Sequence, residues 1–112
     1  MSTAQRDISD GTLVVRRARD AGAEVVSLCG ELDLANAGTA ETELREALSK
    51  GDKVVIDMRE LEFIDSTGIA LLVSALGQNG NGAKLSFIPS ESPAVTRVLE
   101  LTGLAERLPL AG

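Results

Sequence analysis

The segment Asp65-Ser66-Thr67-Gly68 places two hydroxyl groups at the predicted start of a helix. Asp65 or Ser66 can cap this helix, because either side chain can accept a hydrogen bond from a free N–H group of the first turn. The positive end of the helix dipole favours an anion at the same place. A hydroxyl at this position is therefore a candidate acceptor for a phosphoryl group.

Gly68 adds a second feature to this segment. It has no side chain, so we expect another molecule to approach the backbone closely here. The alternative interpretation is structural, because an Asp-Ser or Ser-Thr pair before a helix commonly serves only as a cap. From these four residues alone, both interpretations stay open.

The elements that position this segment are predicted from the apolar pattern. The β-branched run Val54-Val55-Ile56 predicts a strand covered on both faces, and Asp57 ends it. Phe63 and Ile64 are expected to return the chain to the core before the helix. The buried face of that helix is predicted to consist of Ile69, Leu72, Val73 and Leu76, widened by Leu71 and Ala75.

The remaining elements follow from apolar spacing and turn signals. In chain order they are a loose lead-in over residues 1 to about 11, a strand from Leu13, a turn at residues 20–22, a strand over Glu24–Gly30, a helix over Thr39–Leu48 starting near Asn36 or Thr39, a glycine-rich turn over residues 77–82, a strand over Lys84–Ile88, and a helix that starts at Ser92-Pro93 and ends before Gly103. Leu108 is expected either to join a last short strand or to pack against the core.

This order predicts one α/β domain over residues 1–112, with an N-terminal antiparallel hairpin, a mixed but mainly parallel sheet of four to five strands, and about three helices. Loops that follow the carboxyl ends of parallel strands gather at one edge of the sheet. Asp33 follows one strand end and Ser66 lies beyond another. We therefore expect these two side chains to share an edge.

Composition limits the possible functions. Seventeen acidic residues against eleven basic ones give a net charge of −6, which argues against direct nucleic-acid binding and against an anionic membrane surface. The absence of histidine excludes an imidazole base and an imidazole metal site, and no metal or cofactor is expected. Cys29 is expected in the core, and a single cysteine suits a reducing compartment. Neither a signal peptide nor a membrane-length apolar run is present, so a cytoplasmic location is predicted.

Three stretches together resemble a bacterial anti-sigma factor antagonist, a stand-alone STAS domain. They are Gly30-Glu31-Leu32-Asp33, the run from Val55 through Asp65-Ser66-Thr67-Gly68, and Leu101-Thr102-Gly103-Leu104. The resemblance extends from about Thr12 to Leu108. The tetrapeptide in its strand–loop–helix setting, with Glu-Leu-Asp upstream, is far more specific than the tetrapeptide alone.

The resemblance implies a phosphorylation switch. In such proteins the unphosphorylated form binds an anti-sigma factor that is also an ATP-dependent serine kinase, which frees a sigma factor. Phosphorylation of the first hydroxyl, here Ser66, separates the pair, and a metal-dependent serine phosphatase restores the active form. Thr67 varies in the family and leaves open which hydroxyl is used. The implied partner surface consists of Asp33, Asp65, Ser66, Thr67, Gly68 and Ile69.

Two alternative functions would use the same residues differently. A STAS subunit of a lipid transporter or of a larger signalling assembly would use Ser66 only as a helix cap. A response-regulator receiver would accept phosphate on Asp57, but the paired acidic site after the first strand and the late lysine are not in place. Catalysis by the chain itself is not expected, because no nucleophile–base pair or metal cluster is apparent.

Overall fold

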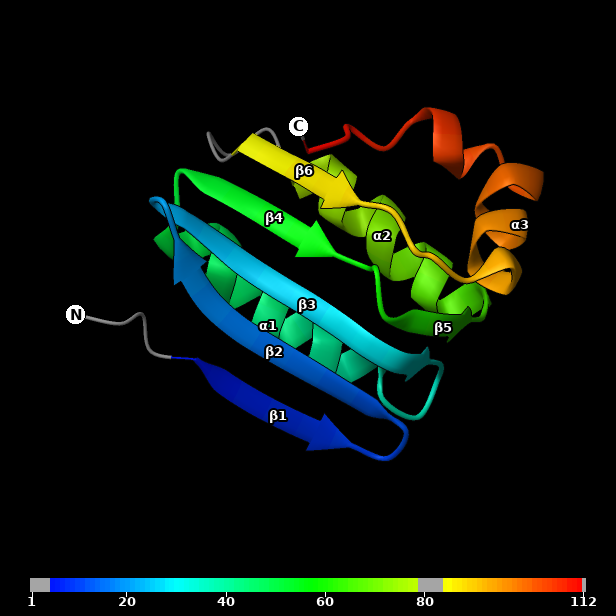
Figure 1. Ribbon diagram of the computed structural model, residues 1–112, viewed down its shortest axis with the longest axis horizontal. Coiled ribbons are helices and arrows are strands. Elements are labelled where there is room, and N and C mark those ends of the chain that lie inside the picture. The colour runs from blue at the N-terminus through cyan, green and yellow to red at the C-terminus, as the bar shows by residue number, and fades with distance from the viewer. Residues whose placement is uncertain (1–4, 79–83, 112) are drawn as a thin grey trace.

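The computed structural model describes residues 5–78 and 84–111, with the helices over residues 37–50 and 66–78 behind a sheet and the helix over residues 93–101 at one end of it (Figure 1). The strands are β1 (Arg6–Asp10), β2 (Leu13–Asp20), β3 (Ala23–Leu32), β4 (Lys53–Asp57), β5 (Leu61–Ile64) and β6 (Lys84–Ile88). The helices are α1 (Ala37–Lys50), α2 (Ser66–Gln78), α3 (Pro93–Leu101) and a 3-10 turn (Leu104–Glu106). No helix within the described residues is long and apolar enough to cross a membrane.

The six strands form one sheet in the order β1-β2-β3-β4-β6, and β5 pairs with β3 beyond the end of β4. The first two pairings are antiparallel, whereas β3 with β4, β4 with β6 and β3 with β5 are parallel. This confirms the predicted α/β class, the N-terminal hairpin and the mainly parallel mixed sheet. The structure has six strands where four to five were predicted, because β1 lies in the segment predicted as a loose lead-in and β5 in the segment predicted as a loop before the helix.

β1 was not predicted from the sequence, because it is held in place mainly by polar side chains. Ile8 is its one large apolar residue, and it is half-buried opposite Val15. Ion pairs also hold the strand, with Arg6 Nη2 lying 2.7 Å from Glu43 Oε1 and Arg16 Nε lying 3.1 Å from Asp7 Oδ1. An apolar pattern cannot reveal a strand whose neighbours supply charged partners.

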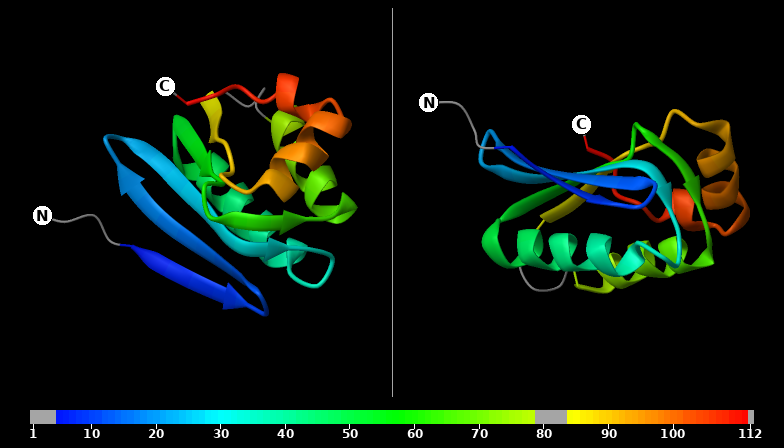
Figure 2. Two further views of the ribbon diagram at one scale, coloured as in Figure 1. Left: turned by 45° about the vertical axis from the view of Figure 1, so that its right-hand side comes forward. Right: turned by 90° about the horizontal axis from the view of Figure 1, so that it is seen from below.

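Helices α1 and α2 cover the same face of the sheet (Figure 2). Val54 and Ile56 point to that face and are fully buried, whereas Val55 points to the other face and is half-buried. The prediction that this strand is covered on both faces is therefore wrong. Cys29 alternates with buried Leu28 in the same way, so it is half-buried and not part of the core cluster. Burial, followed by the charge of Glu60, raises the pKa of its thiol, which does not favour a nucleophilic role.

The buried face of α2 agrees with the prediction except at Val73, and the predicted residues Ile69 and Leu76 pack against the core. Leu71, Leu72 and Ala75 are buried, but Val73 is 40% exposed. Phe63 on β5 is 45% exposed and does not return to the core, whereas Ile64 does. Five residues between Ile69 and Leu76 are large and apolar, so the sequence pattern does not define a single face of this helix.

The remaining predicted elements are confirmed with small shifts of their ends. The strand over Lys84–Ile88 is reproduced, and α3 starts at Pro93 after Ser92. Gly103 follows α3 with a φ of 75°, the left-handed conformation expected after a helix. Leu108 packs in the core, and a single bridge from Leu110 to Phe87 extends the sheet beside β6. The glycine-rich turn falls outside the described residues from residue 79 onward.

A buried ion cluster joins the hairpin to α1. The Arg17 side chain is 8% exposed, and its guanidinium lies 2.9 Å from Glu24 Oε1 and 3.1 Å from Glu43 Oε1. Burial alone would lower the pKa of Arg17, but the hydrogen bonds to Glu24 and Glu43 outweigh it and raise that pKa. The cluster therefore fixes α1 across β2 and β3.

Helix α2 approaches the sheet closely at Gly68. A Cβ atom on this residue would lie 2.6 Å from Ile64 Cγ1 and 3.0 Å from Leu32 Cδ2. The expectation that the bare backbone admits another molecule is therefore wrong, because the free space is filled by the core. Gly77 in the same helix differs, since nothing lies within 4 Å of its Cβ position.

These two glycines give a matched pair of substitutions. We expect Gly68→Ala to lower the free energy of unfolding by about 1–2 kcal/mol, since overpacking outweighs the gain in helix propensity. Gly77→Ala should instead raise it by about 0.5–1 kcal/mol. Urea denaturation of both variants measures the difference. Changes of the same sign would contradict the close approach of α2 to Leu32 and Ile64.

Candidate functional site

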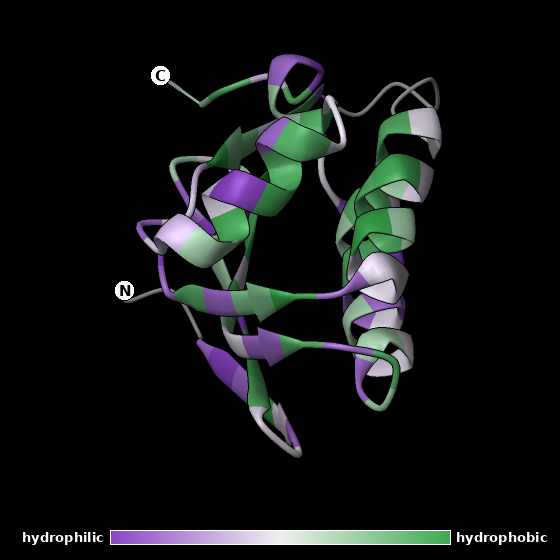
Figure 3. Ribbon diagram, turned by 90° about the vertical axis from the view of Figure 1, so that its right-hand side faces the viewer, coloured by the Kyte–Doolittle hydropathy of each residue, from purple (hydrophilic) through white to green (hydrophobic). Residues whose placement is uncertain are grey.

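The carboxyl ends of β3 and β5 lie side by side and lead into α1 and α2 (Figure 3). The backbone N–H of Asp65 donates to the carbonyl oxygen of Leu32, with N and O 3.2 Å apart. This bond places the start of α2 next to the loop that follows β3. Asp33 and Ser66 therefore lie at the same edge of the sheet, as the order of elements predicts.

Asp65 is the residue that caps α2. Its Oδ1 atom accepts a hydrogen bond from the backbone N–H of Gly68, at 3.1 Å, three residues into the helix. Ser66 is then the first helical residue and not the cap. Of the two caps that the sequence allowed, the structure selects the carboxylate.

The second oxygen of the same carboxylate reaches another part of the chain. Asp65 Oδ2 accepts a hydrogen bond from the backbone N–H of Leu34, with the two atoms 3.1 Å apart. Asp65 thus joins the loop after β3 to the first turn of α2. The sequence placed Asp65 on a partner surface but did not indicate this link.

The loop between β3 and α1 is organised by two of its own side chains. Asp33 Oδ1 accepts a hydrogen bond from Ala35 N–H at 3.0 Å. Buried Asn36 accepts from the Asp33 N–H at 2.9 Å and donates to the carbonyl oxygen of Glu31 at 2.9 Å. Sequence reasoning considered Asn36 only as a helix start, although Asn in a short loop is a known signal for such side-chain-to-backbone bonds.

The two hydroxyl-bearing residues differ in environment. Ser66 is exposed, whereas Thr67 is half-buried. Within residues 5–78 and 84–111, no group accepts a hydrogen bond from the backbone N–H of Ser66 or Thr67. An anion attached to Ser66 would therefore meet two free amide donors and the positive end of the α2 dipole.

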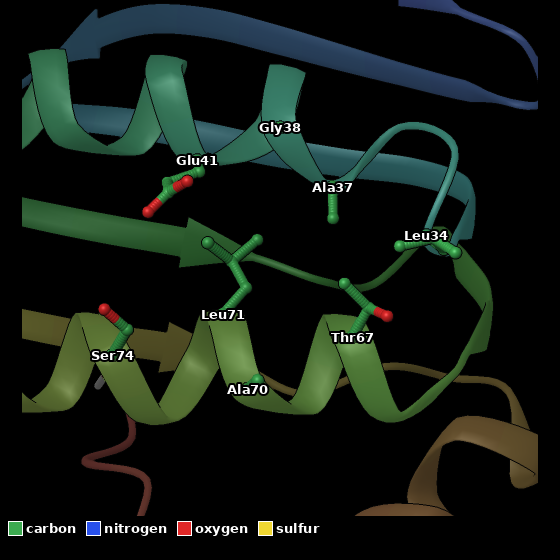
Figure 4. A pocket seen from close by; sticks show the side chains of 8 residues that line it. All are labelled: Leu34, Ala37, Gly38, Glu41, Thr67, Ala70, Leu71 and Ser74. Carbon is green, nitrogen blue, oxygen red and sulfur yellow. The ribbon is translucent and has the colours of Figure 1, made fainter.

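A shallow groove of about 330 Å³ runs between α1 and α2 from this site (Figure 4). Its lining residues are Leu34, Ala37, Gly38, Glu41, Thr67, Ala70, Leu71 and Ser74. Leu34 and Thr67 lie together at one end of it (Figure 4). Of the other residues predicted for the partner surface, Gly68 is buried, and Ile69 is partly buried against the core.

Asp57, the phosphate acceptor in the receiver hypothesis, is occupied by an ion pair. Arg59 Nη2 lies 2.7 Å from its Oδ2, and Arg59 N–H donates to its Oδ1 at 3.0 Å. Burial alone would raise the pKa of Asp57, but the hydrogen bonds from Arg59 outweigh it and lower that pKa. Among the described residues, no group of three metal-ligating side chains surrounds it.

Comparisons with known proteins agree with this architecture. A family model described as "Mlab, STAS domain" matches residues 10–110. An anti-sigma factor antagonist from Mycobacterium paratuberculosis is 25% identical with a TM-score of 0.74, over 97% of this chain and 85% of that one.

The anti-sigma factor antagonist SpoIIAA has the same fold in both of its phosphorylation states. Its unphosphorylated form is 21% identical with a TM-score of 0.68, over 97% of this chain and 89% of that one. The phosphorylated form of SpoIIAA from Bacillus is 18% identical with a TM-score of 0.62, over 97% and 92%. Given the family match over nearly the whole sequence, this chain belongs to the STAS domain family.

Proposed function

We propose that this protein is a phosphorylation-switched anti-sigma factor antagonist. Its unphosphorylated form binds an anti-sigma factor that is also a serine kinase, and this frees a sigma factor. Phosphorylation of Ser66 by that kinase abolishes the binding, and a metal-dependent serine phosphatase reverses it. In this proposal the chain acts in the cytoplasm as a binding partner and not as an enzyme, and it contacts neither nucleic acid nor membrane.

The proposal rests on the position and exposure of Ser66. It is exposed at the first position of α2, and the cap of that helix is already made by Asp65. The alternative of a structural STAS subunit gave Ser66 the role of cap, and the geometry does not support that role. The similarity to anti-sigma factor antagonists supports the partner class.

Charge and size explain why phosphorylation would release the partner. A phosphoserine carries about −1.5 to −2 charge near neutral pH. It would stand beside Asp65 and near the Asp33 loop, on a surface that otherwise offers a neutral hydroxyl. An unfavourable contribution of roughly 2–4 kcal/mol weakens binding by about 30- to 1000-fold. The free amides at the start of α2 can hold this charge without refolding the domain.

The first test is to map phosphorylation on the protein isolated from its own cells. We expect one phosphoryl group on the peptide that contains Ser66, removed by phosphatase treatment and absent from the Ser66→Ala variant. The Thr67→Ala variant serves as the control and should still be phosphorylated. If no growth condition produced the modification and Ser66→Ala kept full function, the structural alternative would be favoured.

The second test concerns Asp33, whose carboxylate orders the loop through Ala35. We expect Asp33→Ala to leave the fold intact and to weaken binding of the kinase by about tenfold, or about 1.4 kcal/mol. Asp33→Asn keeps an acceptor for the Ala35 N–H but removes the charge, so it should retain most of the affinity. Calorimetric titration measures both variants. An unchanged affinity for Asp33→Ala would refute a role for this residue in binding.

A further inference from the structure

We propose that Asp65 is a positioning residue that couples Ser66 to Leu34, and that Leu34 is an apolar anchor for the partner. Phosphorylation of Ser66 would break the hydrogen bond between Asp65 and Leu34 and release this anchor. The inference rests on the proposed function, since it assumes that Ser66 is the modified residue. It extends that function by naming the contact that the phosphate acts on.

Leu34 has the exposure expected of an unoccupied binding residue. Its side chain is 77% exposed at the tip of the loop between β3 and α1, beside Thr67 at the end of the groove. A few side chains that fill well-packed, desolvated pockets commonly carry most of the binding energy of an interface. We therefore infer that the partner presents an apolar recess to Leu34 next to the position that meets the Ser66 hydroxyl.

The loop is fixed at its base and attached to α2 at its tip. Asn36 and Asp33 bind neighbouring backbone groups, and the N–H groups of Asn36 and Ala37 both donate to the carbonyl oxygen of Asp33. At the tip, the bond from Leu34 N–H to Asp65 Oδ2 connects the loop with the start of α2. Loss of that bond would shift Leu34 while the base of the loop keeps its structure.

The two hydrogen bonds of Asp65 are unequal in environment. The bond from Gly68 N–H is partly buried within the first turn of α2, whereas the bond from Leu34 N–H is exposed. A phosphate on the adjacent Ser66 repels the carboxylate and competes with it for the positive end of the helix dipole. The exposed bond to Leu34 is the one expected to break, and α2 stays capped.

The experiment that needs no partner compares amide hydrogen exchange in two forms of the full chain. One form carries phosphoserine incorporated at position 66, and the other carries serine. We expect exchange at Leu34 to become about three- to tenfold faster, the change that corresponds to one lost hydrogen bond, with a smaller change at Gly68. Unchanged exchange at Leu34 would overturn the proposed coupling, whether or not a kinase acts on Ser66.

The Asp65→Asn variant should reproduce the effect without phosphate. The two bonds use separate oxygens of Asp65, and asparagine has an NH₂ donor in place of one of them, so the variant cannot keep both bonds in this geometry. We expect faster exchange at Leu34 in the unphosphorylated variant, whereas Asp33→Asn, which removes a charge from the same loop, should leave it unchanged. Equal exchange in Asp65→Asn and the unmodified protein would contradict the role given to Oδ2.

The anchor is tested with the purified serine-kinase anti-sigma factor of the same cell. We expect Leu34→Ala to weaken its binding by about 10- to 30-fold, as for a residue that dominates an interface. Leu101→Ala is the matched control, because Leu101 on α3 is 75% exposed and lies outside the groove, and its affinity should not change. If Leu34→Ala bound like wild type while phosphoserine at position 66 abolished binding, the anchor would be refuted and the proposed function would stand.

Discussion

The parallel pairing of β5 with the last residues of β3 is the constraint on which the site depends. Gly30 lies at the irregularity of β3 where this pairing begins, and it requires glycine because its φ is 103° and a Cβ atom there would lie 2.1 Å from the carbonyl oxygen of Thr12, just before β2. The register shifts between Gly30 and Glu31, so that Leu32 comes to lie opposite Ile64. The loop after β3 and the first turn of α2 therefore lie close together, and the Asp65 carboxylate accepts a hydrogen bond from each of them.

The ion pairs of the sheet are separate from the site proposed for phosphorylation. Arg17 is held in a buried ion pair with Glu24, where loss of one partner would leave a buried charge, whereas Asp57 at the end of β4 pairs with the exposed Arg59. At the start of α2, by contrast, Ser66 carries a neutral and exposed hydroxyl beside two free amide donors. In the proposed function, a single charge added to Ser66 would therefore act on the surface without disturbing the core.

The sequence predicted this site better than it predicted the strands around it. The Asp-Ser-Thr-Gly segment and Asp33 were placed at one edge because strand ends and a helix start have strong local signals. β1 was missed because its few apolar atoms and its ionic partners on β2 and α1 leave no periodic pattern. Arg17 was overlooked, although it follows Leu13 and Val15 at a spacing of two residues, which places all three side chains on the same buried face.

The sequence by itself determined the α/β class, the order of most elements and the presence of two hydroxyl groups, on Ser66 and Thr67, at the start of a helix, since each depends on residues close together in the chain. Only the tertiary structure decided which residue caps α2, which side of the sheet is covered and which side Gly68 faces. It also decided that Asp65 binds Leu34, 31 positions away. Such contacts depend on the register between strands, which no local pattern specifies.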